Sequence, residues 1–466
     1  MKKNLKKITS LFLMLSLVSA MLFGCGGKNQ QTEENQNNQD LQQDFVPPTS
    51  EPTVTEAPKE FVDYAAQVTL NMSSNTAKVE ATVKTFVDGD TTHFNVSSDL
   101  VESGVFKARY LAINTPESTG KIEEYGKKAS NFTKEKLSQA TSIIIESDTE
   151  VWDIDSTGSR NLVWIWYKTS DSEEYRNLNI EILQNGLALA NSSANNRYGS
   201  YCTAAIAQAK EQKLNLYSGQ KDPDFYYGEA VELTLKELRT NIEQYNGVKV
   251  AFNGIVTKDH SNSVYVEAYD EETGIYYGVS VYYGFNLSGP GLAAIAVGNE
   301  ARIVGTVQYY EAGGTYQVAG LSYRMMKPDD PNNVQMISEG HEPAFVLTTA
   351  DTFVNGMVEV EVAEEMKSFP YAEAAMSTSI SMAGLQVKSV YTTMNEDSSS
   401  YGAMTLNCEA DGIPVAVRTV VLTDANGNLI TAEAYEGKNI DVRGIIDFFD
   451  GQYQIKVFSA KDITIK

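Results

Sequence analysis

The chain has 466 residues, a formal net charge of −24 and only three cysteines. This charge argues against a general nucleic-acid-binding protein, which needs a basic surface over its footprint. Three cysteines are too few for a disulfide-rich secreted scaffold. With 42% hydrophobic residues, however, the chain can build several globular domains of ordinary size.

The first 24 residues have the pattern of an export signal, in which a basic start precedes an apolar run. The run from Leu11 to Ala20 is too short to serve well as a membrane span. It leads into Leu22-Phe23-Gly24-Cys25-Gly26, which resembles the cleavage box of a bacterial lipoprotein. We therefore predict a signal peptide over residues 1–24 and a lipid on Cys25, which would anchor the protein at the extracellular face of the cell membrane. The alternative is an ordinary secretory signal with a chance cysteine.

Residues 25–62 are predicted to be a disordered tether. Between residues 27 and 60 the chain is rich in Gln, Asn, Glu, Thr and Pro and has almost no large apolar side chains. Such a segment cannot bury enough surface to offset the entropy of ordering it.

The acidic charge is concentrated in the C-terminal half. Residues 78–220 carry a net charge of roughly −4, whereas residues 221–466 carry roughly −18. The C-terminal half is therefore a poor electrostatic partner for DNA.

Residues 78–220 alternate between strand and helix patterns. The strand patterns lie at Val79–Val87, Phe106–Ile113, Ile143–Ile145 and Leu162–Trp166. The helix patterns lie at Lys121–Ala140, Asn179–Asn185 and Ala204–Leu214. Strands closed around a helix, with a long C-terminal helix, predict a small five-stranded barrel of the OB type.

Two segments between residues 85 and 117 bring together hard oxygen ligands and an arginine. In Val87-Asp88-Gly89-Asp90-Thr91, two acidic side chains bracket a Gly turn, and Arg109-Tyr110-Leu111-Ala112-Ile113-Asn114-Thr115-Pro116-Glu117 follows about twenty residues later. Carboxylate and other oxygen ligands suit Ca²⁺ or Mg²⁺, and an arginine beside them suits a phosphate. The two segments predict a metal and phosphate site.

These segments, together with Glu124–Thr133 and Ala207–Asn215, resemble the staphylococcal-nuclease (thermonuclease-like) family in order and approximate spacing. The resemblance covers roughly residues 78–220. It implies a nuclease that hydrolyses phosphodiester bonds of DNA or RNA with Ca²⁺ and leaves 3′-phosphate products.

The resemblance also implies residue roles. Asp90, the side chain of Asn114 and the carbonyl of Thr115 would hold the Ca²⁺ ion. Glu117 would align or deprotonate the attacking water. Arg109, and Arg160 in the following loop, would bind the phosphate as negative charge builds on it.

Three departures from the family pattern predict a weaker enzyme. Asn114 stands where an acidic ligand is usual, so one negative charge is lost and the affinity for Ca²⁺ should fall. Thr157 lies near the position of a nucleotide-binding tyrosine, and Ser192–Ala194 replace tyrosines expected to pack on the base. Tyr198 and Tyr201 lie a few residues after Ser192–Ala194 in the sequence.

The C-terminal half contains an internal repeat. Gly298–Gly305 and Gly437–Gly444 match each other, and each is followed by an aromatic pair and a Gly turn. We predict a mainly β protein, in which the nuclease-like barrel at residues 63–225 is followed by OB-like domains at residues 226–340 and 341–466. Tyrosines between residues 265 and 283 could stack on bases, but their pattern favours ordinary strand-face residues.

Other catalytic classes have little support. His93, His260 and His341 are scattered, which argues against a triad or a zinc site. No Gly-rich phosphate loop occurs, so no nucleotide cofactor is expected. The alternative to an enzyme is a surface binding lipoprotein, catalytically weak or inactive, whose OB-like domains capture an oligonucleotide, a glycan or a protein.

Overall fold

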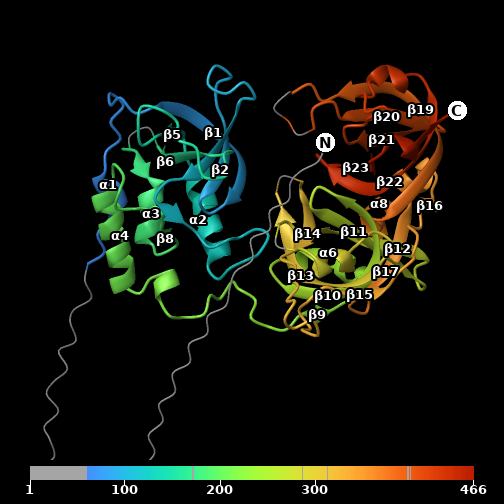
Figure 1. The fold of residues 1–466 in the computed structure, drawn as a ribbon, viewed down its shortest axis with the longest axis horizontal. Helices are drawn as coiled ribbons and strands as arrows, with labels where there is room; N and C mark the ends of the chain where they lie inside the picture. Colours follow the sequence, from blue (N-terminus) through green and yellow to red (C-terminus); the bar gives the residue numbers. More distant parts are fainter. Residues whose placement is uncertain (1–59, 171–172, 286, 312, 396–397, 399) are drawn as a thin grey trace, which may run out of the picture. The chain divides into compact units, whose positions relative to one another are not determined.

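A computed structural model describes residues 60–170, 173–285, 287–311, 313–395, 398 and 400–466 (Figure 1). The predicted signal peptide, the lipidation site at Cys25 and almost all of the predicted tether lie outside the described residues. In the part that is described, no helix is both long enough and apolar enough to cross a membrane.

The first barrel is a closed sheet of five main strands. These are β1 (Lys78–Asp88), β2 (Thr91–Asn95), β3 (Val105–Tyr110), β5 (Ser142–Glu146) and β6 (Asn161–Lys168). Antiparallel pairs join β1 to β2, β2 to β3, β1 to β5 and β5 to β6, and a parallel pair of β3 with β6 closes the ring. The short strand β7 (Arg176–Asn177) adds to this sheet beside β6, whereas β4 (Ile113–Asn114) and β8 (Leu189–Ala190) pair with each other in a separate two-stranded sheet. The predicted OB-type barrel is confirmed.

Helices cover this barrel at α1 (Tyr64–Gln67), α2 (Gly126–Ser138), α3 (Leu178–Gln184), α4 (Gly199–Glu211) and the 3₁₀ turn η1 (Asn215–Tyr217). The helix expected from Lys121 begins only at Gly126, because Tyr125 has a left-handed φ of 64° and its amide donates to the carboxylate of Asp222 at 2.6 Å. A Cβ on Gly126 would lie 2.2 Å from the carbonyl oxygen of Glu117. Glycine is therefore required where the helix approaches the loop that carries Glu117.

Large aromatic side chains fill the first barrel. Trp164, Trp166 and Phe94 are fully buried. The buried carboxylate of Glu146 accepts hydrogen bonds from the indole of Trp166 at 2.8 Å and the phenol of Tyr198 at 3.0 Å. Tyr198 is thus part of the core, because its hydroxyl satisfies a buried acid and its ring packs edge-on against Trp164.

The second barrel is built from β9 (Val231–Glu232), β10 (Lys249–His260), β11 (Ser263–Asp270), β12 (Ile275–Tyr282), β13 (Glu300–Tyr310), β14 (Thr315–Ala319) and β15 (Gln335–Ser338). Its helical elements are α5 (Leu235–Thr240), η2 (Ile242–Tyr245) and α6 (Pro290–Ala294). The third barrel is built from β16 (Val346–Leu347), β19 (Ser379–Thr392), β20 (Met404–Ala410), β21 (Ile413–Thr419), β22 (Asn439–Phe449), β23 (Gln452–Val457) and β24 (Ile463–Ile465). It also carries α7 (Ala350–Asn355), the hairpin of β17 (Met357–Val362) and β18 (Glu365–Pro370), α8 (Tyr371–Ala374), η3 (Ala432–Ala434) and η4 (Ala460–Asp462).

The internal repeat corresponds to one topology used twice. The strand orders are β9-β10-β11-β12-β14-β13-β15 and β16-β19-β20-β21-β23-β22-β24, so the two sheets correspond strand by strand. Each ring closes by an antiparallel pair, β10 with β13 and β19 with β22, and includes a parallel pair, β12 with β14 and β21 with β23. The flanking short strands β9 and β16 are also parallel to their neighbours β10 and β19. The first barrel follows the same plan, so the prediction of a mainly β chain with three OB-like barrels is confirmed. The domain boundaries themselves remain a prediction.

A buried carboxylate joins the second and third barrels, whose apolar side chains belong to one continuous core. Glu267 on β11 accepts hydrogen bonds from the amides of Ala344 at 3.0 Å and Ser379 at 2.6 Å, and from the Ser379 hydroxyl at 2.9 Å. Its side chain is fully buried, and burial raises its pKa even though these hydrogen bonds favour the charged form.

We expect Glu267 to make folding dependent on pH. Because its folded pKa lies above the ordinary value of 4.5, the folded state holds the proton more tightly than the unfolded state. Its contribution to the free energy of unfolding is therefore complete below pH 4.5 and falls as the pH rises through the folded pKa. In urea titrations, the stability advantage of the wild type over Glu267→Gln should shrink as the pH rises. Glu359→Gln, at an exposed position of β17, is the control. If the difference in stability between the wild type and Glu267→Gln stayed constant with pH, the raised pKa of Glu267 would be contradicted.

Candidate active site

The turn between β1 and β2 places two acidic side chains at one end of the first barrel. Asp88 and Asp90 are 6% and 4% exposed, so both carboxyls are buried. Gly89 between them packs directly on the neighbouring chain, since an added Cβ would lie 2.9 Å from the hydroxyl oxygen of Thr115 and 3.0 Å from the Cβ of Ala129. The Gly89 carbonyl accepts a 2.6 Å hydrogen bond from Thr133 on α2, which fixes the turn against that helix.

Asp90 is the centre of a hydrogen-bond cluster. Its Oδ2 accepts the amide of Thr115 at 2.8 Å and forms an ion pair with Nη1 of Arg109. The other guanidinium nitrogen of Arg109, Nη2, donates to Oδ1 of Asn114 at 2.7 Å. The structure therefore brings together Asp90, Arg109, Asn114 and Thr115, four of the residues predicted for the site.

Glu117 lies in the loop that follows this cluster, with an exposed side chain. The next residue, Ser118, donates to Oδ1 of Asp88 from its hydroxyl at 2.6 Å and from its amide at 3.2 Å. Burial, with the neighbouring carboxyls of Glu117 and Asp90, raises the pKa of Asp88 to about 8, against the hydrogen bonds from Ser118. Glu117 is therefore held next to the buried acid. The ligand set predicted from the resemblance omits Asp88, although the Asp88-Gly89-Asp90 pattern contains it.

Arg160 reaches the same end of the barrel on the neighbouring strand. The parallel pairing sets Ala108 opposite Asn161 and Arg109 opposite Leu162, so Arg160 directly precedes the part of β6 that lies beside β3. Its guanidinium binds Asp155 within its own loop, with Nε and Nη2 at 2.8 and 2.6 Å from Oδ2. Hydrogen bonds and charge from Thr157 and Arg160 outweigh a partial burial and lower the pKa of Asp155 to about 2. The Arg160 side chain is 30% exposed, so a phosphate can approach it.

A buried amide fixes the chain between Arg109 and Asn114. Asn179, at the start of α3, donates from Nδ2 to the carbonyls of Leu111 and Val163, both at 2.9 Å, and accepts the amide of Ile165 at 3.0 Å. It thereby ties the end of β3 to β6. Ala112 has a left-handed φ of 70°, an uncommon conformation for a residue with a Cβ. Asn179 is missing from the predicted site; the only sequence signal is a polar residue on the buried face of an apolar helix.

The positions expected to hold a base do not provide an aromatic surface. Tyr198 is buried against Trp164 and Trp166, as described above. The hydroxyl of Thr157 donates to Asp155 at 2.7 Å, which makes it part of the Arg160 loop. Ser192 lies in a turn with a left-handed φ of 54°. Tyr201 on α4 is half-buried and packs against the same core. We therefore expect binding at this site to rely mainly on the sugar–phosphate backbone of the substrate.

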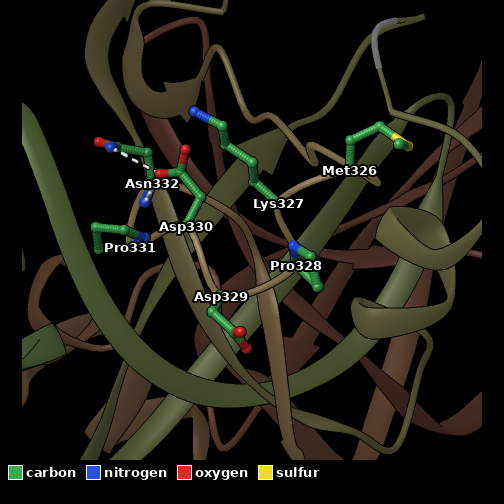
Figure 2. Close-up of a pocket in the computed structure, with 7 residues that line it drawn as sticks. All are labelled: Met326, Lys327, Pro328, Asp329, Asp330, Pro331 and Asn332. Carbon is green, nitrogen blue, oxygen red and sulfur yellow. Dashed lines mark hydrogen bonds between the residues drawn. The ribbon is translucent and has the colours of Figure 1, made fainter.

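Two surface hollows lie in the second barrel. One is formed by a single loop at residues 326–332, where Figure 2 shows the amide of Asn332 directed at Asp330. This carboxylate accepts the Asn332 side chain at 3.1 Å and pairs with Arg324 at 3.1 Å. Because the Asp330 carboxylate already has these partners within its own loop, we assign no ligand to this hollow. The other hollow, of about 420 Å³, is lined by residues of α5, β10 and β11, with Tyr277 of β12.

Residues 107–219 match the family model described as Staphylococcal nuclease homologue. These residues form a nuclease-like domain of that family. The match includes Arg109, Asn114, Thr115, Glu117 and Arg160, whereas the Asp88-Gly89-Asp90 turn lies before its first residue. A comparison of the whole chain with curated proteins finds no match.

Oxygen ligands of the kind that Ca²⁺ accepts lie at this end of the barrel, in Asp90, Asn114 and Thr115. Among the described residues, no group of three or more His, Cys, Asp or Glu side chains is placed to hold a metal. A cation beside Asp90 would therefore also use the amide oxygen of Asn114 and the carbonyl of Thr115, which are ligands that Ca²⁺ accepts. The Thr115 hydroxyl is buried without a hydrogen-bond partner, and burial, together with the neighbouring carboxyls of Glu117 and Asp90, raises the pKa of Asp88. Both observations fit a hard cation at this place.

We expect Gly89→Ala to disrupt the site and to destabilise the nuclease-like domain. The new methyl group would overlap Thr115 and Ala129, and overpacking of this kind costs about 1–3 kcal/mol. Thermal unfolding should show a lower midpoint, and any phosphodiesterase activity should fall because Asp88 and Asp90 are displaced. Asn95→Ala, at the exposed end of β2, is the control. An unchanged midpoint in Gly89→Ala would show that Thr115 and Ala129 can move aside to accommodate the methyl group.

Proposed function

We propose that this chain is a cell-surface nuclease that hydrolyses phosphodiester bonds of DNA, RNA or both with the help of Ca²⁺. The observation that carries the proposal is the cluster in which Arg109 bridges Asp90 and Asn114 at one end of the nuclease-like barrel. A guanidinium that is held by two oxygen partners and remains partly exposed is suited to a phosphate, which accepts paired N–H donors.

Glu117 is the proposed general base. Its exposed carboxylate can reach water, and the bonds from Ser118 to Asp88 keep its loop against the buried acids. A base must lie within hydrogen-bond reach of the water that it deprotonates. The neighbouring carbonyl of Glu117 accepts the Glu123 amide at 2.8 Å, so the backbone at the base is also fixed.

Arg109 and Arg160 are the proposed phosphate ligands. Each is already paired with a carboxylate, Arg109 with Asp90 and Arg160 with Asp155, so both guanidinium groups are oriented before substrate arrives. Donors that are oriented in advance stabilise the charge that develops on the phosphate without further reorganisation. Together they would favour the transition state over the ground state.

Asp90, Asn114 and the Thr115 carbonyl are the proposed Ca²⁺ ligands. When bound there, the ion would neutralise charge on the phosphate and favour attack by water. By family resemblance, the products would carry 3′-phosphates. We further propose that a lipid on Cys25, which lies outside the described residues, anchors the protein at the extracellular face of the membrane, with residues 25–62 as a tether.

We expect Glu117→Gln to remove most of the catalysis while leaving the fold intact. Positioned general bases typically contribute about 10²- to 10⁴-fold to a rate, so kcat should fall within this range. The measurement is cleavage of a single-stranded DNA and a matched RNA with Ca²⁺ and again with EDTA. Glu135→Gln, an exposed acid on α2, is the control. Absence of Ca²⁺-dependent cleavage in the wild type, or full activity in Glu117→Gln, would favour the alternative of a binding lipoprotein.

We expect Asn114→Asp to tighten Ca²⁺ binding. The substitution restores a negative charge beside Asp90, and ligand charge is a main determinant of Ca²⁺ affinity. The Ca²⁺ concentration for half-maximal activity should fall by about tenfold. Asn71→Asp makes the same change of charge at an exposed turn and should leave the Ca²⁺ dependence unaltered. Equal half-saturation in all three proteins would exclude Asn114 from the ligand set.

A further inference from the structure

The outer face of the first barrel carries a row of basic side chains that begins at Arg109. On β3, Lys107 precedes Arg109 by two residues, so the two side chains leave the same face of the sheet. Lys107 pairs with His93 on β2, and His93 pairs with Thr85 on β1. Cross-strand partners lie on one face, so His93 continues the row beyond Lys107.

A bulge in β1 adds a further lysine to this row. The pairing of β1 with β2 shifts between Val83 and Thr85, which leaves Lys84 as the extra residue. Bulges redirect side chains at the point where they interrupt a ladder. Lys84 is exposed and lies beside the partner of His93, so the row reaches across three strands.

The charges that act on His93 support this placement. Burial lowers the pKa of the imidazole, and the positive charges of Lys107, Lys84 and Arg160 lower it further. These cations come from β3, β1 and the loop before β6. No carboxylate is among the groups that shift the pKa of His93. The face around His93 is thus locally positive, although the nuclease-like domain carries a net charge of roughly −4.

The two lysines are free to bind a ligand. Arg109 and Arg160 are paired with Asp90 and Asp155, respectively. Lys84 and Lys107, by contrast, are exposed, and neither forms an ion pair with any residue that the structure describes. Exposed cations without acidic partners are available for phosphate oxygens at little cost in desolvation.

We propose that Lys84, His93 and Lys107 form a track that binds the sugar–phosphate backbone of a single-stranded nucleic acid next to the phosphate site at Arg109. The proposal rests on the proposed nuclease function and names the part of the substrate beyond the scissile phosphate. We call these three residues the cationic track. It lies on β1, β2 and β3, and its recognition of phosphate is independent of base sequence.

The geometry favours an extended single strand. Residues two apart on a strand are separated by roughly 7 Å, and neighbouring strands by about 4.8 Å. Lys107 and Arg109 are therefore spaced like successive phosphates of an extended chain. The second and third strands of an OB barrel form a usual surface for oligonucleotides. Because the expected base-packing tyrosines are absent, contacts to the backbone have to supply the affinity.

The test uses the full-length chain with Glu117→Gln, so that binding is measured without cleavage. The probe is a fluorescent oligothymidylate of about 20 nucleotides, titrated in Ca²⁺ at salt concentrations from about 50 to 200 mM. Adding Lys84→Gln and Lys107→Gln should raise Kd about tenfold at the lower salt concentrations. Two lost phosphate contacts should also make the slope of log K against log salt shallower by roughly 1.4.

The matched control is Lys210→Gln with Lys213→Gln, which removes the same charge at the end of α4 in the same domain. It should leave both Kd and the salt slope unchanged. A second measurement compares cleavage by proteins that retain Glu117. The track variant should show about a tenfold higher KM for the long oligonucleotide, with the same kcat and unaltered cleavage of a dinucleotide.

The outcomes separate the two proposals. Equal binding and equal salt slopes for the track variant and its parent would overturn the cationic track, whether or not the chain cleaves nucleic acid. If the track variant and the Lys210/Lys213 control lost binding affinity equally, the effect would be one of net charge alone, and the cationic track would again be overturned. If the wild type cleaves nothing while the track variant still loses binding, the nuclease function fails and the track stands.

Discussion

The ion pair between Arg109 and Asp90 is the interaction on which the candidate site depends. It joins the turn after β1 to strand β3, and the second arm of the guanidinium extends the link to Asn114. The side chains of Arg109 and Asp90 are only 12% and 6% exposed. Removing one partner of such a pair leaves an uncompensated buried charge, which typically costs about 3–5 kcal/mol. Loss of activity on replacing either residue therefore has to be separated from loss of folding.

The features that cost stability are gathered around this pair. Asp88 is a buried acid with a raised pKa, the Thr115 hydroxyl lacks a partner, and Ala112 has a left-handed backbone. Each is tolerated because rigid elements surround it: Thr133 of α2 binds the Gly89 carbonyl, and Asn179 of α3 fixes the chain next to Ala112. Unfavourable local features that the surroundings enforce are typical of functional sites.

Much of this arrangement could be predicted from the sequence, because it is encoded locally or by repetition. The Asp88-Gly89-Asp90 pattern predicts a tight turn, and the paired repeat in the C-terminal half predicts two barrels of one topology. The start of α2 could not be predicted, since it depends on Asp222, almost a hundred residues away in the sequence. The pairing of Arg109 with Asp90 likewise could not be derived from spacing alone, because it follows from the register of β2 against β3.

Net charge is a poor guide to what this chain can bind, since charge acts locally in salt. At physiological ionic strength the Debye length is about 8 Å, so exposed charges further apart than this are largely screened. Most of the excess acid lies in residues 221–466, whereas Lys84, Lys107 and Arg160 act together on one imidazole in the nuclease-like domain. A phosphate beside His93 therefore experiences mainly these neighbouring cations. The overall acidity disfavours diffuse attachment of nucleic acid elsewhere on the protein, and it leaves a small basic face as the favourable place for a polyanion.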